Sequence, residues 1–106
     1  MKLPSLSHLQ LAVLGALVAG ERKGREIRGE LKQARVTHSG PAFYQMMSRL
    51  EDAGFVFGWY SQKVVAGQII KERHYRITPA GRRAFKEARD FYARLIAAAE
   101  EAPARA

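Results

Sequence analysis

The sequence predicts a mainly α-helical domain with one small β-hairpin, an α+β fold. Three stretches with the helical spacing of apolar residues come first, and two runs of β-prone residues follow them. A last, long helical stretch closes the chain, so the expected order is helix, helix, helix, strand, strand, helix. A polar-faced helix followed directly by a basic hairpin is typical of a winged helix-turn-helix, which binds DNA through that helix.

The first helix is expected from Leu6 to Ala19, where two apolar stripes run along the same segment. A helix that is apolar over most of its circumference should be buried on two sides. One side would meet the domain's own core, and the other could meet a second subunit. The residues assigned to that second side are Leu11, Leu14 and Val18.

A second helix is expected from Gly24 to about Arg35, with Ile27 and Leu31 facing inward. Its outer surface is basic, and it could lie against the DNA backbone as the first helix of a helix-turn-helix does. Glutamates are interleaved with these cations, so several should be paired on a solvated face. The residues expected to contact the backbone are Lys23, Arg25 and Arg28.

The third helix is expected from Pro41 to Gly54, with Ser39 as its N-cap. Its apolar stripe should face the core, while the opposite face is polar and sparsely charged. Such a face lets a helix approach base edges in a groove, although an ordinary amphipathic surface helix would show the same pattern. The residues expected to contact DNA are Ser39, Pro41, Ala42, Tyr44, Gln45, Ser48 and Arg49.

The hairpin is expected to run from Phe55 to Val65 and from Ile69 to Ile77, around a turn at 66–68. Its tip region is expected to carry positive charge, offset only by Glu72, which fits contact with phosphate. An edge hairpin protected from aggregation by its charges would look similar. The wing residues expected to contact DNA are Lys63, Lys71 and Arg73.

The last helix should begin at Thr78-Pro79 and run to about Glu101. Its apolar residues recur with the spacing of a coiled-coil seam, and about 23 residues would extend about 34 Å, too far for this small domain to cover. Pairing between two subunits is expected, and folding back across its own domain is the alternative. The expected interface residues on this helix are Phe85, Ala88, Tyr92, Leu95 and Ala99. We therefore expect a DNA-binding domain over residues 1–78. Residues 79–106 should form a dimerisation helix with a frayed tail.

The composition favours a polyanionic partner. The 106 residues carry a net charge of +8 and a pI near 10.3, for which double-stranded DNA is the expected partner, although RNA or anionic lipid would also satisfy the charge. There is no cysteine, which excludes disulfides, thiolate zinc sites and a cysteine nucleophile. With no membrane-length apolar run, no histidine pair at metal spacing and no glycine-rich phosphate loop, we expect a cytoplasmic protein without metal, cofactor or enzymatic activity.

Aromatic residues could form a pocket near the subunit interface. Phe57, Trp59, Phe91 and Tyr92 could line it together with the second face of the first helix. A site of that kind would bind a small aromatic or apolar effector. Aromatic residues at these spacings are more often ordinary core.

Three segments share their order and spacing with a known family. They are Lys23-Gly24-Arg25-Glu26-Ile27, then Ser39-Gly40-Pro41-Ala42-Phe43-Tyr44-Gln45 with Arg49-Leu50-Glu51-Asp52-Ala53-Gly54, and finally Tyr75-Arg76-Ile77-Thr78-Pro79-Ala80-Gly81. The chain resembles PadR-family transcriptional regulators over roughly 6–96, in the compact version with a single C-terminal helix. Each segment is weak alone, and together they are specific.

The sequence also departs from the family pattern. Arg25 replaces the usual aromatic residue, Gly40-Pro41 inverts the usual order, and Gln45 replaces the proline after the tyrosine. Tyr44 matches the family's DNA-contacting tyrosine. Gln45 could hydrogen-bond a base edge, most naturally adenine, so the preferred sequence could differ from that of relatives.

We therefore expect a sequence-specific DNA-binding regulator that acts as a homodimer on a pseudo-palindromic operator. Its two recognition helices would lie about 34 Å apart, in successive major grooves. The resemblance implies a repressor that is relieved by a small molecule or another signal. The alternative is a winged-helix module that binds a protein partner or structured RNA.

Overall fold

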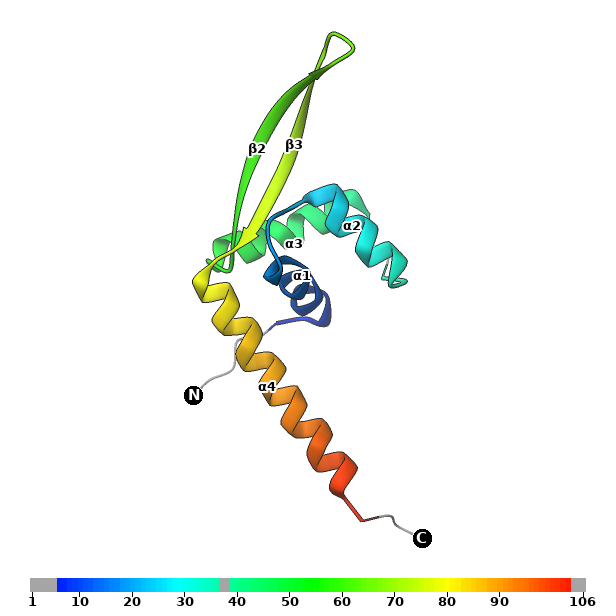
Figure 1. Cartoon of the computed structure of the whole chain (residues 1–106), viewed down its shortest axis with the longest axis vertical. Coiled ribbons are helices and arrows are strands. Elements are labelled where there is room, and N and C mark those ends of the chain that lie inside the picture. Colours follow the sequence, from blue (N-terminus) through cyan, green and yellow to red (C-terminus); the bar gives the residue numbers. More distant parts are fainter. Residues whose placement is uncertain (1–5, 37–38, 104–106) are drawn as a thin grey trace.

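The computed structural model describes residues 6–36 and 39–103. Its elements are α1 (His8–Val18), β1 (Arg22–Lys23), α2 (Gly24–Gln33), α3 (Gly40–Asp52), β2 (Val56–Val65), β3 (Gln68–Ile77) and α4 (Pro79–Glu101). Helices α1 to α3 form a body from which the β2-β3 hairpin and α4 project in opposite directions (Figure 1). The molecule consequently measures 68 × 30 × 22 Å. The expected winged-helix order is confirmed, and element bounds differ from expectation by no more than two residues.

The core lies between the three body helices and the base of the hairpin. Leu14, Leu17, Ile27 and Met47 are completely buried there, and Tyr75 of β3 closes the core at 1% exposure. This corrects the assignment of Leu14 to a subunit interface, because a side chain with no exposed surface has none to offer a second subunit. Leu14 instead packs in the core of its own chain, while Val18 of the same stripe is exposed.

Side-chain caps fix three helix starts. The Ser7 hydroxyl accepts a hydrogen bond from the Gln10 amide, the Ser39 hydroxyl from the Ala42 amide, and the Thr78 hydroxyl from the Gly81 amide. Each hydroxyl satisfies an amide that the first helical turn leaves without a partner. The caps expected at Ser39 and Thr78 are confirmed.

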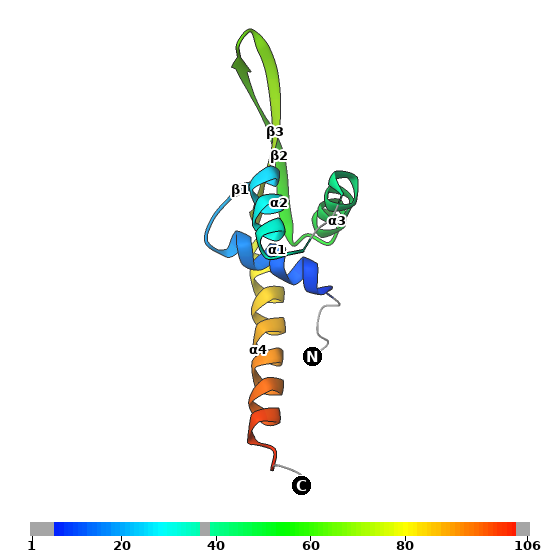
Figure 2. The same cartoon turned by 90° about the vertical axis from the view of Figure 1, so that its right-hand side faces the viewer.

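The sheet has three antiparallel strands in the order β1-β3-β2. Strand β1 pairs Arg22 with Tyr75 and Lys23 with His74, and it was not expected, since two residues are too few to show a strand periodicity. Figure 2 shows β1 beside the base of the hairpin. Ala66 and Gly67 join β2 to β3 with φ of 52° and 79°. Two positive φ values match a turn whose twist suits a hairpin.

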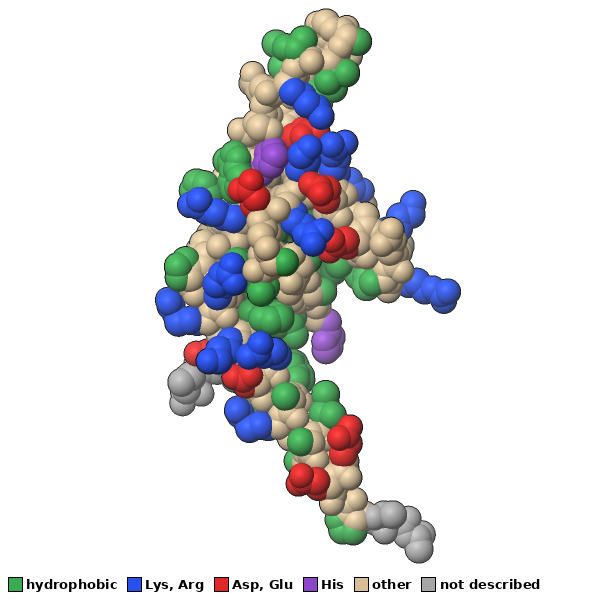
Figure 3. Space-filling model, viewed as in Figure 1, with side chains coloured by type: hydrophobic (Ala, Val, Ile, Leu, Met, Phe, Trp, Pro, Cys, Tyr) green, Lys and Arg blue, Asp and Glu red, His purple; other side chains and the backbone are tan. Residues whose placement is uncertain are grey.

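The outermost part of the wing is apolar, contrary to expectation. Val64 and Ile69 face each other next to the turn and are 72% and 68% exposed. Lys63, Lys71 and Arg73 lie further back, opposite Ile70, Gln62 and Tyr60. In Figure 3 the upper end of the molecule shows hydrophobic and neutral atoms, and the first blue side chains appear below it. The positive charge that was expected at the tip therefore lies along the middle and the base of the wing.

Helix α4 changes character along its length. Its first three turns bury Gly81, Ala84 and Ala88, and α4 packs against α1. The residues from Phe91 to Glu101 are all exposed. Ala88 is only 7% exposed, so it belongs to the packed half and is not free for a second subunit. Part of the expected frayed tail, residues 104–106, lies outside the described residues, and no helix in the described part is long and apolar enough to span a membrane.

Candidate nucleic-acid interface

One face of α3 is left open by the rest of the chain. The opposite face buries Phe43, Met46, Met47 and Leu50 in the core. The residues on the open face are small or polar, and six of the seven that the sequence assigns to DNA contact are exposed: Ser39, Pro41, Ala42, Gln45, Ser48 and Arg49. A helix face of this kind can enter a groove, because its small side chains allow a close approach and its polar ones can hydrogen-bond base edges.

Tyr44, the seventh residue, is half-buried between α3 and α2. Its ring meets Phe43 edge to face with centroids 5.0 Å apart, and it packs against the core. A side chain at Gly24 would bring a Cβ within 3.0 Å of the Tyr44 ring and hydroxyl. Gly24 therefore makes room for Tyr44, which serves packing as well as presenting one edge to solvent.

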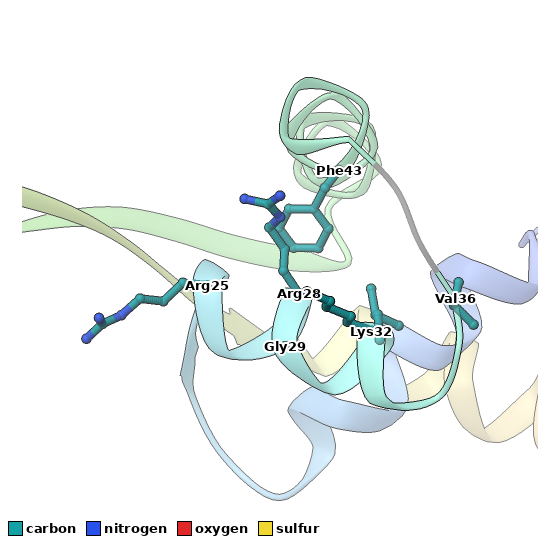
Figure 4. Close-up of a pocket in the computed structure, with 7 residues that line it drawn as sticks. Arg25, Arg28, Gly29, Lys32, Val36 and Phe43 are labelled. Carbon is teal, nitrogen blue, oxygen red and sulfur yellow. The ribbon is translucent and has the colours of Figure 1, made fainter.

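A hollow of about 390 Å³ lies between α2 and the start of α3. Its walls combine Leu31, Val36 and Phe43 with the cations Arg28 and Lys32. Figure 4 shows Arg28 rising from α2 beside Phe43, and Arg25, at the start of α2, also lines the hollow. The structure thus brings Arg28 to the N-terminal end of α3, where exposed cations and free helix amides favour a phosphate.

The base of the wing is tied to α3 by an ion pair. Arg73 Nη2 lies 2.6 Å from Glu51 Oε1, and both side chains are 23% exposed. The Arg73 guanidinium also lies 4.5 Å from the centre of the Tyr60 ring and 5.5 Å from that of Tyr75. Burial raises the pKa of the Tyr75 phenol, and the neighbouring Arg73 partly opposes this. Arg73 is thus engaged within the chain, and its expected contact with phosphate stays a prediction.

On the other face of β3, the carboxylate of Glu72 forms ion pairs with three cations. Its carboxylate lies 3.0 Å from Lys23 Nζ, 3.0 Å from Arg25 Nη2 and 3.2 Å from Lys63 Nζ. The contact with Lys23 is the largest cause that lowers the pKa of Glu72, and Lys63 and Arg25 lower it further, against an opposing effect of burial. Three of the expected phosphate contacts, from α2 and the wing, therefore meet at one carboxylate.

Three of the cations assigned to DNA contact, Arg28, Lys71 and Arg49, are exposed and have no carboxylate partner among the described residues. Lys71 is exposed on β3, and Arg49 is exposed near the end of α3. Glu51, which is close to Arg49 in the sequence, pairs with Arg73. Arg28, Lys71 and Arg49 are accordingly available to a polyanion.

The four aromatic residues expected to line an effector pocket form two separate pairs. Phe57 and Trp59 lie on β2 with ring centroids 5.9 Å apart, and Trp59 stacks on His74. Phe91 and Tyr92 meet edge to face on α4, 5.4 Å apart. The hollow between α2 and α3 is lined by neither pair.

The remaining residues assigned to a subunit interface differ in accessibility. Val18, Tyr92 and Leu95 are 37%, 39% and 54% exposed, and Ala99 is exposed as well. Leu11 and Phe85 are partly buried. The Phe85 ring packs close to Gly15 of α1, so its contact is mainly within the chain.

Sequence reasoning missed the central role of Glu72. The signal was present, because Glu72 is the single carboxylate in a wing that carries several cations. What it did not indicate was that Lys23 and Arg25, almost fifty residues earlier in the chain, would share that carboxylate. The unexpected strand β1 brings Lys23 beside β3 and makes the shared contact geometrically possible.

The three-helix body, the open face of α3 and the attached hairpin define a winged helix-turn-helix. Residues 13–87 match the model of the transcriptional regulator PadR-like family, more than half of the chain. The chain belongs to this family, and it is accordingly a transcriptional regulator and not an enzyme.

Solved structures share this fold at low sequence identity. A PadR family regulator from hypervirulent Clostridium difficile superposes with a TM-score of 0.76 at 14% identity, over 90% of this chain and 97% of that one. A transcriptional regulator from Clostridium thermocellum gives 0.68 at 20% identity, over 89% and 88%. Bacillus subtilis PadR, solved in complex with operator DNA, gives 0.61 at 21% identity, over 76% of this chain and 46% of that one. No curated protein matches the chain.

Proposed function

We propose that the chain is a sequence-specific DNA-binding repressor whose recognition helix is α3. The observation that carries the proposal is the open face of α3, small and polar, flanked by cations from α2 and from the wing. Base edges in a major groove are read by such a face, while the surrounding cations neutralise phosphates. The relative solved with operator DNA has the same fold, which supports this choice of partner.

The proposed acting species is a homodimer in the cytoplasm. Phe91, Tyr92, Leu95 and Ile96 are 37–56% exposed on the part of α4 that its own chain leaves uncovered. Burial of apolar surface of this kind favours association with a second copy. Residues 1–78 would then bind DNA and residues 79–106 would pair the subunits. A two-fold dimer would hold the recognition helices about 34 Å apart on a pseudo-palindromic operator.

We further propose that a signal relieves repression, carried by a small aromatic or apolar effector. A ligand that spread or closed the two recognition helices would shift the dimer between binding and non-binding spacings. The exposed aromatic residues on β2 and α4, Phe57 and Phe91 among them, are the surfaces on which such a ligand could act once two subunits are paired.

Selection of duplexes from a random pool tests the proposed function. The expected product is a pseudo-palindrome whose half-sites are centred about one helical turn apart, 10 to 10.5 base pairs, or a multiple of this. Enrichment of no duplex would contradict sequence-specific binding. A single unrepeated half-site would retain DNA binding and contradict the dimer.

Two alanine variants separate base reading from backbone contact. Gln45→Ala removes an exposed amide on α3, so we expect a loss of about 1–3 kcal/mol on the selected duplex and a changed base preference. Lys71→Ala should weaken all duplexes alike and reduce the salt slope by about 0.9. Titrations at several salt concentrations measure both. Identical behaviour of the two variants would contradict the division of roles.

The alternative is a winged-helix module that binds structured RNA or a protein partner. The net charge of +8 and the exposed apolar wing tip are compatible with either. Competition between the selected duplex, a structured RNA of equal charge and no nucleic acid distinguishes these functions. Equal competition by the RNA would favour the alternative.

A further inference from the structure

Glu72 occupies an unusual place among the cations of the proposed interface. It is the acceptor of three ion pairs, and its partners come from three other elements: Lys23 from β1, Arg25 from the start of α2, and Lys63 from β2. Glu72 itself is on β3. One carboxylate therefore connects the wing to the helix-turn-helix body.

The exposure of the four side chains differs in a way that matters for a polyanion. The Glu72 side chain is 10% exposed, whereas those of Lys23, Arg25 and Lys63 are 31%, 64% and 48% exposed. Three cations around one carboxylate leave a net charge of +2 at this place. Because the carboxylate lies inside and the cations outside, the solvent-facing surface of the cluster is positive.

The cluster borders a hollow of about 250 Å³ where the wing meets the recognition helix. The hollow is lined by Lys23, Arg25, Tyr44, Ile70, Lys71, Glu72 and Arg73. It thus combines a residue of α3, cations of the body and the exposed Lys71 of the wing. Its size and charge suit one phosphate group of a DNA backbone.

The residue after Glu72 on β3, Arg73, forms an ion pair in which the wing supplies the cation and the body the carboxylate. Arg73 places a cation of the wing on Glu51, a carboxylate near the end of α3, while Glu72 places a carboxylate of the wing among cations of the body. Since successive residues of a strand point to opposite faces, the two links hold the wing from both sides. Together they connect the wing to the body at two neighbouring residues of β3.

We propose that Glu72 is a positioning residue for sequence-specific DNA binding, an inference that rests on the proposed function. The carboxylate gathers Lys23, Arg25 and Lys63 so that they meet a backbone phosphate at the hollow when α3 lies in its groove. A carboxylate repels phosphate, so Glu72 contributes to operator binding only through the geometry that it imposes. Its removal should therefore have opposite effects on specific and on non-specific binding.

The experiment compares Glu72→Gln with the wild-type protein on two duplexes at one salt concentration. The duplexes are the sequence most enriched by the wild-type protein and a shuffled duplex of the same length and composition. We expect tighter binding of the shuffled duplex, because one negative charge is lost, and weaker binding of the enriched one. The ratio of the two affinities should fall about tenfold, comparable to the loss of one good specific contact.

Two further variants separate geometry from charge. Glu30→Gln removes the same formal charge from a carboxylate of α2 that pairs with the single cation Arg22, and its affinity ratio should stay at the wild-type value. Glu72→Asp keeps the charge and shortens the side chain, so it should lower the ratio in the same direction as Glu72→Gln. If Glu72→Gln fails to fold, as circular dichroism would show, Glu72→Asp still decides the question.

The outcomes are distinct. A fall in the ratio for both Glu72 variants, with Glu30→Gln unchanged, supports a positioning role. A ratio that is unchanged, or that rises, shows that Glu72 acts only through its charge and overturns the inference while leaving DNA binding intact. If the wild-type protein prefers no duplex, the proposed function fails and the inference fails with it.

Discussion

The wing and α4 project from the same body, and their anchors differ in how far charged side chains add to apolar packing. At the base of the wing, charged side chains meet across elements, with Glu72 among three cations and Arg73 on Glu51. At the base of α4, small residues let the helix approach closely, since Gly81, Ala84 and Ala88 are buried. The wing thus adds ion pairs to the core packing of Tyr75, whereas α4 is anchored mainly by apolar packing.

The two kinds of anchor should therefore respond to different changes in solution conditions and in sequence. Ion pairs of partly exposed groups are screened by salt and lost when one partner is neutralised, so the angle of the wing should respond to solution conditions. Close apolar packing responds mainly to changes in volume. Both arms end in exposed apolar residues, such as Val64 on the wing and Leu95 on α4, which the chain itself does not cover.

The largest effect is expected at the anchor of α4. A Cβ at Gly81 would collide with the carbonyl oxygen of Phe55 and come within 2.8 Å of Ile77 Cγ1. Backbone cannot move aside as a flexible side chain can, so Gly81→Ala should lower the free energy of unfolding by about 3 kcal/mol or more. Urea denaturation followed by circular dichroism measures this loss.

Gly29 provides the matched control. It lies within α2, and a Cβ there would meet no atom within 4 Å. Gly29→Ala should therefore raise the free energy of unfolding by about 0.5–1 kcal/mol, because alanine loses less backbone entropy in a helix. The same substitution would then have opposite signs at two helices. A small effect at Gly81 would contradict close packing as the anchor of α4.

The second largest effect is expected at the ion pair of the wing. Arg73→Gln leaves Glu51 without its cation in a site where both side chains are only 23% exposed. We expect a loss of about 1–3 kcal/mol in the free energy of unfolding. Trp59 is the only tryptophan of the chain and lies on β2 at the base of the wing, so its fluorescence in urea reports on this region.

Arg76→Gln is the control on the same strand. Arg76 is exposed and lies over the Phe57 ring at 4.7 Å, without a carboxylate partner in the described part of the chain. Its substitution should cost less, about 0.5–1 kcal/mol for an exposed cation over a ring. Equal losses for the two variants would show that the Glu51 pair adds nothing beyond surface packing.

Local signals were enough to predict most of the fold. The caps at Ser39 and Thr78, the apolar stripe of α3 and the alternation in the hairpin are all contained within short segments, and the structure has each of them. What could not be predicted was which surface covers an apolar stripe. Leu14 and Leu95 both looked suitable for a subunit interface, yet Leu14 is buried in its own core and Leu95 is 54% exposed.

Only part of the candidate site, likewise, could be predicted from the sequence. The open face of α3 follows from its own periodicity, so its exposed residues, Gln45 among them, could be assigned from the sequence. The pairing of charges could not, because it depends on which elements meet. Arg73 was assigned to DNA without its pairing to Glu51 being expected, and Lys23 reaches Glu72 through a strand too short to be recognised.

The smallest expected effect concerns the titration of the wing base. The pKa of Glu72 is lowered below its ordinary value of 4.5, first by Lys23 and then by Lys63 and Arg25. A carboxylate with a depressed pKa stabilises the folded state above its unfolded pKa, and this stabilisation is lost as the pH falls through the folded pKa. The Glu72 contacts should therefore persist down to a pH below about 4.5, the ordinary range of a glutamate.

Lys23→Gln tests the cause of this shift. Removing the cation with the largest effect should raise the pKa of Glu72 toward its ordinary value, and the contacts should be lost at a correspondingly higher pH. The chemical shift of the Glu72 side-chain carboxyl carbon, followed by NMR across the acidic range, measures the pKa in both proteins. An unchanged pKa in the variant would show that Lys23 does not hold the carboxylate in solution. The ion pairs between wing and body would then be those of Arg25 with Glu72 and of Arg73 with Glu51, and charge would contribute less to the anchor of the wing than we infer.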